Sequence, residues 1–289
     1  MPRTAYVNGR YLPLREAAVS VEDRGYQFAD GVYEVAALMN GRLLDWPAHL
    51  ARLERSAREL AMAPPAAARL SLVAGRLLAA NALRDGLLYI QWSRGVARRD
   101  HGVPAGVRPS LVMTVRPFDF AAKRRALDSG IGVALVPDER WLRPDIKSVS
   151  LLPNVLAKEA ARAAGAAEGW MVRDGLVTEG GSTNAWIVTS SGAVVTRAAD
   201  RSILRGVMRD TLMRLQNEAG VRIEERPFTP DEARRAAEAF ITSTTNPCVP
   251  VVRIDGAAVG NGTPGPVTRR LADALWAEIE RQTGWRTAA

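Results

Sequence analysis

Asn40-Gly41 stands between Val32-Tyr33-Glu34-Val35-Ala36 and Leu43-Leu44, and this stretch decides how the first part of the chain folds. An Asn-Gly pair between two strand-like stretches is typical of the two-residue turn of a β-hairpin, because both turn positions need a positive φ. The same pattern occurs at Asn8-Gly9. The sequence therefore predicts two β-hairpins near its N-terminus.

The rest of the chain mixes strands with helices. A helix should begin at Pro47 and carry apolar residues from Leu50 to Leu60 on one face. Thr229-Pro230-Asp231-Glu232 is a capping box with proline at the first helical position, which predicts another helix start. Further helices are expected at about 66–83 and 152–164, after Gly206 and from Pro266. Strands are expected at 87–93, 110–116, 131–136 and 240–243, with short strands around Asp174-Gly175 and Ser191-Gly192 and a strand–turn at Asp255-Gly256.

The order of these elements predicts an α+β fold, because strands and helices follow one another without regular β-α-β alternation. Pro117-Phe118-Asp119-Phe120 interrupts the pattern and marks a boundary. We expect a small N-terminal domain over residues 1–118 and a larger C-terminal domain over residues 119–289.

Composition indicates an ordinary soluble globular protein. The 289 residues are 47% hydrophobic and 24% charged, which is enough to bury a substantial core. The N-terminus has no apolar segment of a signal peptide, and no apolar run approaches the length of a membrane span. We therefore expect a cytoplasmic protein with no membrane partner.

The residue inventory restricts metal and nucleic-acid chemistry. Cys248 is the only cysteine and His49 and His101 are the only histidines, so an internal disulfide and a multi-histidine or thiolate metal site are excluded. A carboxylate-only metal site stays open but has no support, and we expect no metal. The net charge of +8 comes from scattered residues, and the densest cluster, Lys123-Arg124-Arg125, has no interleaved aromatics. A solvated basic surface is therefore expected, with no nucleic-acid partner.

Lysine is rare in this chain. Only Lys123, Lys147 and Lys158 supply amines, and the other basic side chains are arginines, which do not give up their proton to act as nucleophiles. Lys147 follows a proline at the end of an apolar strand region, where a side chain can point into a cleft. Position alone leaves a functional amine and a solvated surface lysine equally open for Lys147.

Three other segments gather glycines and hydroxyls that suit an anionic ligand. Small residues let backbone N–H groups approach an anion, and a helix N-terminus can hold a phosphate. Ordinary surface turns and loops are the simpler interpretation of each segment alone. The segments are Val177-Thr178-Glu179-Gly180-Gly181-Ser182-Thr183-Asn184, Leu204-Arg205-Gly206-Val207-Met208 and Thr242-Ser243-Thr244-Thr245-Asn246.

Taken together, the motifs resemble those of the D-amino acid transaminases, in order and spacing, over almost the whole chain. The resemblance implies a fold-type-IV pyridoxal-phosphate enzyme related to the branched-chain aminotransferases, with a mixed, barrel-like sheet in a larger cofactor-binding domain. The motifs are Asp23-Arg24-Gly25-Tyr26-Gln27-Phe28-Ala29-Asp30-Gly31-Val32-Tyr33-Glu34-Val35, His49-Leu50-Ala51-Arg52-Leu53, Asp145-Ile146-Lys147-Ser148, Asn154-Val155-Leu156-Ala157-Lys158, Thr178-Glu179-Gly180 and Thr242-Ser243-Thr244-Thr245.

The resemblance implies pyridoxal 5'-phosphate as the cofactor. Lys147 would form the Schiff base and shuttle a proton, Glu179 would keep the pyridine nitrogen protonated, and Arg52 would clamp the phosphate. These types suit the chemistry, because a Schiff-base lysine must lose its proton near neutral pH and a cationic ring nitrogen calls for a carboxylate. The other implied cofactor contacts are Ser182, Leu204, Val207, Met208 and Thr244.

The resemblance also implies a trap for the substrate carboxylate. The D-amino acid enzymes carry an Arg-x-His pair in one loop and a tyrosine from the early hairpin, which here are Arg99, His101 and Tyr33. A simply exposed loop is the alternative for the first two, and the neighbouring Arg98 leaves open which guanidinium binds. The remaining expected substrate contacts are Val35 and Thr245.

Two positions depart from the family pattern. Met208 stands where a threonine is usual beside the phosphate, and Gly181 replaces a more usual serine. Both changes are expected to loosen the contacts around the cofactor.

The implied activity is ping-pong transfer of an amino group between D-amino acids, such as D-alanine and D-glutamate, and 2-oxo acids, such as 2-oxoglutarate. The alternatives are an (R)-amine transaminase, alone or as a second activity, then a branched-chain L-amino acid transaminase or an aminodeoxychorismate-type lyase, and, from another class, a nucleic-acid-binding module. The resemblance further implies a homodimer in which Arg99 and His101 reach the neighbouring active site.

Overall fold

Both Asn-Gly pairs form the turns that the sequence predicts. In the computed structural model, which describes residues 3–287, φ is 46° and 100° at Asn8 and Gly9, and 50° and 77° at Asn40 and Gly41. Each turn joins two antiparallel strands. These strands are β1 (Thr4–Val7) with β2 (Arg10–Pro13) and β3 (Gly31–Met39) with β4 (Arg42–Leu43).

The chain folds into two units, each with its own core. The first contains the described residues up to Asp119 together with Ile146–Ser150 and Gln282–Trp285, and the second contains Phe120–Asp145, Leu151–Arg281 and the described residues from Arg286. The functional division into domains 1–118 and 119–289 stays a prediction, and residues 1–2 and 288–289 lie outside the described part.

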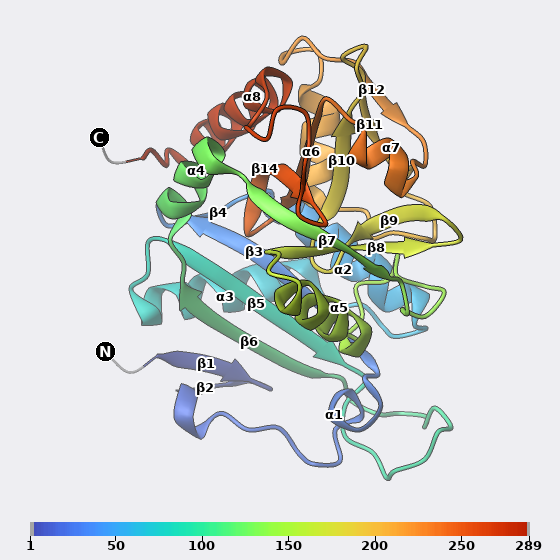
Figure 1. The fold of residues 1–289 in the computed structure, drawn as a ribbon. Helices are drawn as coiled ribbons and strands as arrows, with labels where there is room; N and C mark the ends of the chain where they lie inside the picture. Colours follow the sequence, from blue (N-terminus) through green and yellow to red (C-terminus); the bar gives the residue numbers. More distant parts are fainter. Residues whose placement is uncertain (1–2, 288–289) are drawn as a thin grey trace. The chain divides into compact units, whose positions relative to one another are not determined.

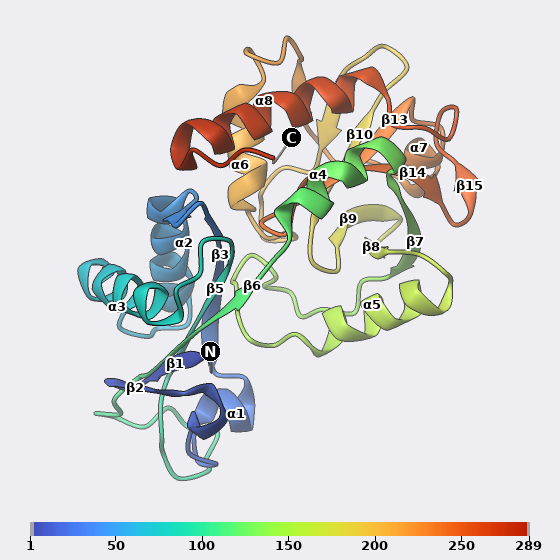
Figure 2. The ribbon, with the colours of Figure 1, turned by 90° about the vertical axis from the view of Figure 1, so that its left-hand side faces the viewer.

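The first unit is built on a six-stranded sheet in which every neighbouring pair is antiparallel (Figure 1). Its order is β2-β1-β6-β5-β3-β4, with β5 (Gly86–Ser93) and β6 (Ser110–Pro117) at the centre. Helices α2 (Trp46–Glu59) and α3 (Ala67–Asn81) cover one face (Figure 2), close to their predicted positions. The sequence did not predict the 3-10 turn η1 (Leu14–Glu16) or the short helix α1 (Arg24–Phe28).

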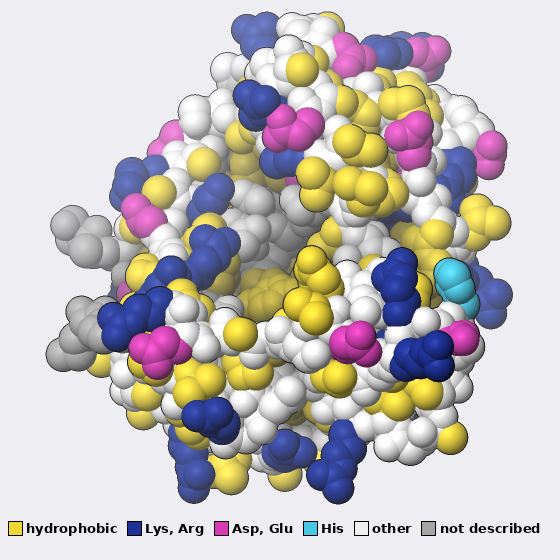
Figure 3. Space-filling view, turned by 90° about the horizontal axis from the view of Figure 1, so that it is seen from below, with side chains coloured by type: hydrophobic (Ala, Val, Ile, Leu, Met, Phe, Trp, Pro, Cys, Tyr) yellow, Lys and Arg dark blue, Asp and Glu magenta, His cyan; other side chains and the backbone are white. Residues whose placement is uncertain are grey.

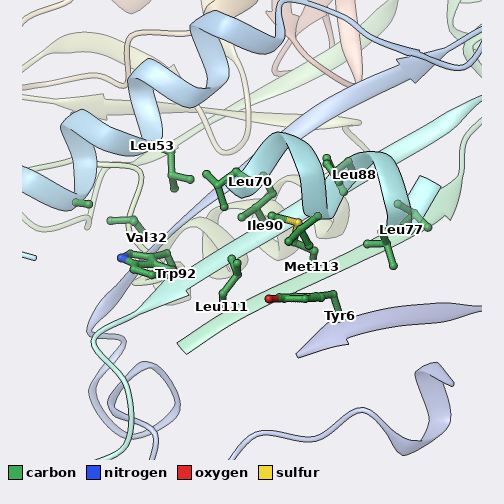
Figure 4. Packing of buried hydrophobic residues seen from close by; sticks show 14 of the residues in the cluster. Tyr6, Val32, Leu53, Leu70, Leu77, Leu88, Ile90, Trp92, Leu111 and Met113 are labelled. Atoms are coloured by element: carbon green, nitrogen blue, oxygen red, sulfur yellow. The ribbon is translucent and has the colours of Figure 1, made fainter. Parts of the chain in front are cut away.

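The core of the first unit lies between these helices and the sheet. Leu53 of α2 and Leu70 and Leu77 of α3 point toward Ile90 and Met113 of the sheet (Figure 4), and all five side chains are at most 1% exposed. Burial of each leucine stabilises the fold by roughly 2 kcal/mol. The apolar face of α2 expected from its helical spacing is therefore the face that anchors it.

The second unit contains a nine-stranded mixed sheet that curls into a half barrel (Figure 2). The order is β12-β11-β10-β13-β14-β7-β8-β9, with β15 pairing only with β14. The pairs β11–β12, β14–β7 and β7–β8 are parallel. The strands are β7 (Ile131–Pro137), β8 (Glu168–Arg173), β9 (Leu176–Gly180), β10 (Asn184–Val188), β11 (Val194–Thr196), β12 (Ile223–Glu225), β13 (Glu238–Ser243), β14 (Asn246–Ile254) and β15 (Ala257–Ala258).

Helices pack against this sheet. Helix α4 (Phe120–Ser129) contacts β14, α5 (Leu152–Ala163) contacts β7 and β8, and α6 (Val207–Leu215) contacts β13. The capping box holds as predicted, because the Thr229 side chain accepts a hydrogen bond from the Glu232 N–H at the start of α7 (Pro230–Arg234). Helix α8 (Pro266–Thr283) is the last element. Mixed strands and helices with a curled sheet confirm the predicted α+β class, although α4 was not predicted.

Surface charge is dispersed. Lys and Arg side chains are spread over the face seen in Figure 3, with Asp and Glu among them. Exposed pairs such as Arg281 with Glu218 and Arg234 with Asp255 neutralise part of the positive charge. Within residues 3–287, every helix is too short or too polar to cross a bilayer.

Gly95 marks a close approach of two backbone segments in the first unit. Its φ is +107°, and a Cβ there would collide with the carbonyl oxygen of Arg108, whereas Gly9 has a similar φ of +100° and nothing within 4 Å of its Cβ position. Gly9→Ala should lower the free energy of unfolding by about 1–3 kcal/mol through backbone strain, and Gly95→Ala by ~2 kcal/mol more. Denaturant melts of the two variants measure this difference, and equal losses would contradict the close approach.

Candidate active site

Lys147 is fixed to the first unit through its backbone. Its carbonyl oxygen accepts a hydrogen bond from the Tyr33 N–H (2.9 Å), and its own N–H donates to Ser56 Oγ on α2 (3.2 Å). Two residues later, the Val149 N–H donates to the Gly31 carbonyl (3.0 Å). The lysine segment thus runs antiparallel beside the start of β3, with a single β-bridge between Ser148 and Val32.

The side chain of Lys147 lies against an aromatic ring. Its Nζ is 4.2 Å from the ring centroid of Tyr33, which stacks on Tyr89 of β5 with centroids 5.7 Å apart. Burial and the neighbouring Tyr33 raise the pKa of Tyr89 to about 12, so its phenol stays neutral at physiological pH. None of the described carboxylates forms an ion pair with the half-buried amine. A cation–π contact of this kind contributes ~0.5–1 kcal/mol and leaves the amine available.

Glu34 points to the opposite face of β3 from Tyr33, toward α2. Arg52 donates from Nε to Oε1 (2.6 Å) and from a terminal nitrogen to Oε2 (2.9 Å), and His49 Nδ1 lies 2.8 Å from Oε2. Burial favours the neutral acid, but Arg52 and His49 hold the pKa of Glu34 well below its usual range. An ionised carboxylate, 1% exposed, therefore orients the Arg52 guanidinium. The sequence pointed to Arg52 but not to Glu34; the three-residue spacing of His49 and Arg52 on one helix face was the available signal.

The other residues predicted for substrate binding in the first unit lie on β3 and in one loop. Val35 follows Tyr33 on the same face of β3 and is half-buried. Arg99 and His101 are exposed in the loop between β5 and β6, and both contact the ring of Phe28.

Glu179 on β9 is a buried carboxylate that accepts hydrogen bonds from three groups of the second unit. Arg140 and the Leu204 N–H (2.9 Å) donate to Oε1, and Asn184 Nδ2 donates to Oε2 (3.0 Å). The same Asn184 nitrogen donates to the Leu204 carbonyl (2.9 Å). Two predicted site residues, Glu179 and Leu204, are thus joined directly and through Asn184.

Arg140 links Glu179 to a second buried carboxylate, Asp138. It donates to Oδ1 (2.9 Å) and Oδ2 (2.8 Å) of Asp138, which also accepts from Thr178 Oγ1 (2.8 Å) and Arg173 (3.0 Å). Burial raises the pKa of Glu179, and the Arg140 guanidinium opposes that rise. Burial also disfavours the charge on Arg140, but Glu179 and Asp138 raise its pKa above the usual value. The sequence did not indicate Arg140 or Asp138.

The remaining predicted cofactor residues lie on turns and at a helix start. Val207 and Met208 open α6, whose N-cap Gly206 makes no side-chain capping bond, so the first N–H groups of the helix need another acceptor. A Cβ at Gly206 would collide with Oδ1 of Asn184, so glycine is required there. Ser182 is exposed, and its hydroxyl donates to Glu168 (2.8 Å). The half-buried Thr244 and Thr245 form the turn between β13 and β14.

The structure brings predicted site residues into direct proximity in three places. The first unit brings Lys147 against Tyr33 and places Arg99 and His101 on one ring, and the second brings Glu179 against Leu204. Other predicted residues make different contacts: Arg52 with Glu34, Ser182 with Glu168, and Thr245 with Ser243. The chain thus offers an accessible amine, a fixed guanidinium and a buried carboxylate balanced by arginine.

Known proteins are similar in sequence to this chain over nearly its full length. The family model described as Amino-transferase class IV matches residues 31–254, a range that contains Arg52, Lys147 and Glu179. A D-alanine aminotransferase of Bacillus licheniformis is 42% identical over 277 residues, covering 96% of this chain and 97% of that protein. A D-alanine aminotransferase of Staphylococcus haemolyticus is 38% identical over 280 residues, covering 96% and 98%.

The fold is also shared with a solved aminotransferase. The branched-chain aminotransferase of the thermophilic archaeon Thermoproteus uzoniensis, solved with norvaline, superposes with a TM-score of 0.85 at 26% identity, covering 98% of this chain and 98% of that one. Fold and sequence therefore agree with the resemblance seen in the motifs. The chain belongs to the class IV amino-transferase family.

Proposed function

We propose that this protein is a pyridoxal-phosphate-dependent transaminase that moves amino groups between D-amino acids, of the D-alanine and D-glutamate type, and 2-oxo acids such as 2-oxoglutarate. The observation that carries the proposal is the 42% identity, over 96% of the chain, with a D-alanine aminotransferase. The amine, carboxylate and guanidinium groups described above are those that this chemistry requires.

Lys147 is the amine that binds the cofactor covalently and carries a proton to and from the substrate Cα. Bound pyridoxal phosphate supplies an electron sink for the negative charge that develops at that carbon. The other lysines suit the role less well: Lys158 Nζ donates to the Ala167 carbonyl (2.6 Å) and lies 3.6 Å from Glu168, and Lys123 belongs to a basic cluster on α4. Lys147 instead rests on the ring of Tyr33, where loss of its proton breaks no ion pair.

Glu179 is assigned to the pyridine nitrogen of the cofactor. The nitrogen is a better electron sink when protonated, and an ionised carboxylate stabilises its positive charge. Arg140 supports the ionised form of Glu179 against the effect of burial, and Asn184 and the Leu204 N–H fix its orientation. Leu204 is in turn assigned to pack against the cofactor ring.

The phosphate is assigned to Arg52, the first N–H groups of α6 and Thr244, and Ser182 is assigned as a further cofactor contact. Glu34 orients the Arg52 guanidinium, and a helix N-terminus favours an anion. At the start of α6, Met208 provides a backbone N–H but no hydroxyl, so we expect one fewer phosphate contact than a threonine would give. The groups assigned in each unit suit the cofactor chemically. Hydrogen-bond donors match its phosphate, and a carboxylate matches its ring nitrogen.

The substrate carboxylate is assigned to Arg99, His101 and Tyr33, with Val35 and Thr245 as further substrate contacts. We propose a homodimer in which the first two residues serve the neighbouring subunit's active site. The cytoplasmic location stays a prediction.

The alternatives have less support. An (R)-amine transaminase does not require the carboxylate-binding pair Arg99 and His101, and the curated relatives at 36–42% identity carry the name D-alanine aminotransferase. The branched-chain aminotransferases that share the fold are only 22–26% identical. D-Amino acids are therefore the amino donors in the ping-pong reaction that we propose.

The donor preference is tested by one half-reaction. The purified holoenzyme should lose its cofactor absorbance on addition of D-alanine at least about 100-fold faster than with L-alanine, because Lys147 would remove the Cα proton of only one enantiomer. Stopped-flow absorbance measures both rates, and Lys147→Ala should show neither. Equal rates with the two enantiomers would contradict the D-amino acid assignment while leaving a transaminase.

The role of Arg140 is tested by cofactor affinity. Arg140→Met removes the charge that opposes protonation of Glu179, so we expect pyridoxal phosphate to bind the apoprotein about tenfold more weakly at about pH 7. A carboxyl with a raised pKa is neutral below that pKa and ionised above it, so the deficit should shrink at about pH 9.

Arg140→Lys keeps the positive charge beside Glu179 and Asp138 and serves as the matched control. It should retain most of the affinity in the same absorbance titration. A deficit for Arg140→Met that is equal at both pH values, or shared fully by Arg140→Lys, would contradict the electrostatic role.

A further inference from the structure

The loop between β5 and β6 is anchored by a buried arginine from a distant part of the sequence. Arg24, on α1, has a side chain only 4% exposed, and it donates to the backbone carbonyls of Asp100 (2.6 Å) and Gly102 (3.2 Å). These two carbonyls lie on either side of His101. One guanidinium therefore fixes the backbone at the residue that is assigned to the substrate carboxylate.

Arg24 is itself held by a charge network. Its Nε donates to Asp30 Oδ2 (2.8 Å), and Arg94 Nε donates to the same oxygen (2.7 Å). Burial favours the neutral acid, but Arg94 and Arg24 hold the pKa of Asp30 below its usual range. Arg94 also donates to the Leu60 carbonyl at the end of α2 (2.8 Å), so the start of the loop is tied to the helical layer.

Phe28 connects this anchor to the two assigned side chains. The Arg24 guanidinium carbon is 4.8 Å from the Phe28 ring centroid, and the two residues are four apart on α1, so they share one side of the helix. The Arg99 guanidinium carbon is 4.9 Å from the same centroid, and the His101 ring centroid is 5.3 Å away. One half-buried ring thus contacts both side chains that are assigned to carboxylate binding.

We propose that Phe28 is a positioning residue for substrate binding, which holds Arg99 and His101 in place to receive the substrate carboxylate. This inference rests on the proposed function, because it takes these two residues as the carboxylate trap. Of the two adjacent arginines in the loop, Arg98 and Arg99, the proposal assigns carboxylate binding to Arg99, because its guanidinium lies over the Phe28 ring.

The physical basis is preorganisation. A free arginine side chain on an exposed loop samples many rotamers, and binding a carboxylate in two-point geometry must suppress them. An aromatic face removes part of that freedom beforehand, because it attracts the planar guanidinium without using its N–H donors. Phe28 can therefore hold Arg99 while leaving its donors available to the substrate.

Binding without turnover tests the proposal. 2-Aminoisobutyrate has the amino acid carboxylate but no Cα hydrogen, and tert-butylamine replaces that carboxylate with a methyl group. Each is titrated into the holoenzyme while the cofactor absorbance is followed. Phe28→Leu should raise the Kd of 2-aminoisobutyrate about fivefold to tenfold and leave that of tert-butylamine unchanged.

Two variants control for the ring and for the fold. Phe28→Tyr keeps the aromatic face and should bind 2-aminoisobutyrate as the unmodified protein does. Phe118 is another half-buried phenylalanine of the first unit, and the guanidinium carbon of Arg116 lies 5.6 Å from its ring centroid. Phe118→Leu should therefore change neither Kd. Thermal melts of all variants identify any loss of folded protein.

Arg99→Ala separates this proposal from the proposed function. If Arg99→Ala raises the Kd of 2-aminoisobutyrate and Phe28→Leu does not, the role of Phe28 is wrong and the carboxylate trap stands. If neither variant changes that Kd, the trap itself is wrong and the inference falls with it. If Phe28→Leu weakens both ligands equally, the residue acts on the fold and the positioning role is also wrong.

Discussion

The hydrogen bond from the Tyr33 N–H to the Lys147 carbonyl is the contact that fixes the position of the proposed catalytic lysine. It attaches a five-residue segment, Ile146–Ser150, to the first unit, although the residues on either side belong to the second. The pairing along β3 places the lysine amine against the Tyr33 ring. Because a strand alternates its faces, Glu34, next to Tyr33, points the other way and orients Arg52. One strand therefore positions the amine, the phenol and the guanidinium.

Arginine neutralises three buried carboxylates, Glu34 in the first unit and Asp138 and Glu179 in the second. Glu34 is matched by Arg52 and His49, and Glu179 shares Arg140 with Asp138. Arginine suits these positions because its planar group binds a carboxylate at two points and stays charged when buried. Lys147, one of only three lysines in the sequence, rests on an aromatic ring instead.

Local signals in the sequence predicted local structure well. The Asn-Gly turns, the proline at the start of α2 and the Thr229 capping box all act over a few residues, and each was confirmed. Partners far apart in the chain were not predictable in this way: Arg140 meets Glu179 across 39 positions, and Arg24 meets Asp100 across 76. The resemblance to a family supplied the candidate residues Lys147, Glu179 and Arg52, but not the neighbours that hold them. Those neighbours depend on strand pairing that no single segment encodes.

The most direct test of the central claim is to find which lysine carries the cofactor. Borohydride reduction of the holoenzyme makes the bond between the lysine and pyridoxal phosphate permanent, and peptide mass spectrometry then locates the phosphopyridoxyl group. With only three lysines in the chain, the assignment is unambiguous. We expect the group on Lys147 alone. A label on Lys123 or Lys158, or no label on a protein that binds the cofactor, would contradict it.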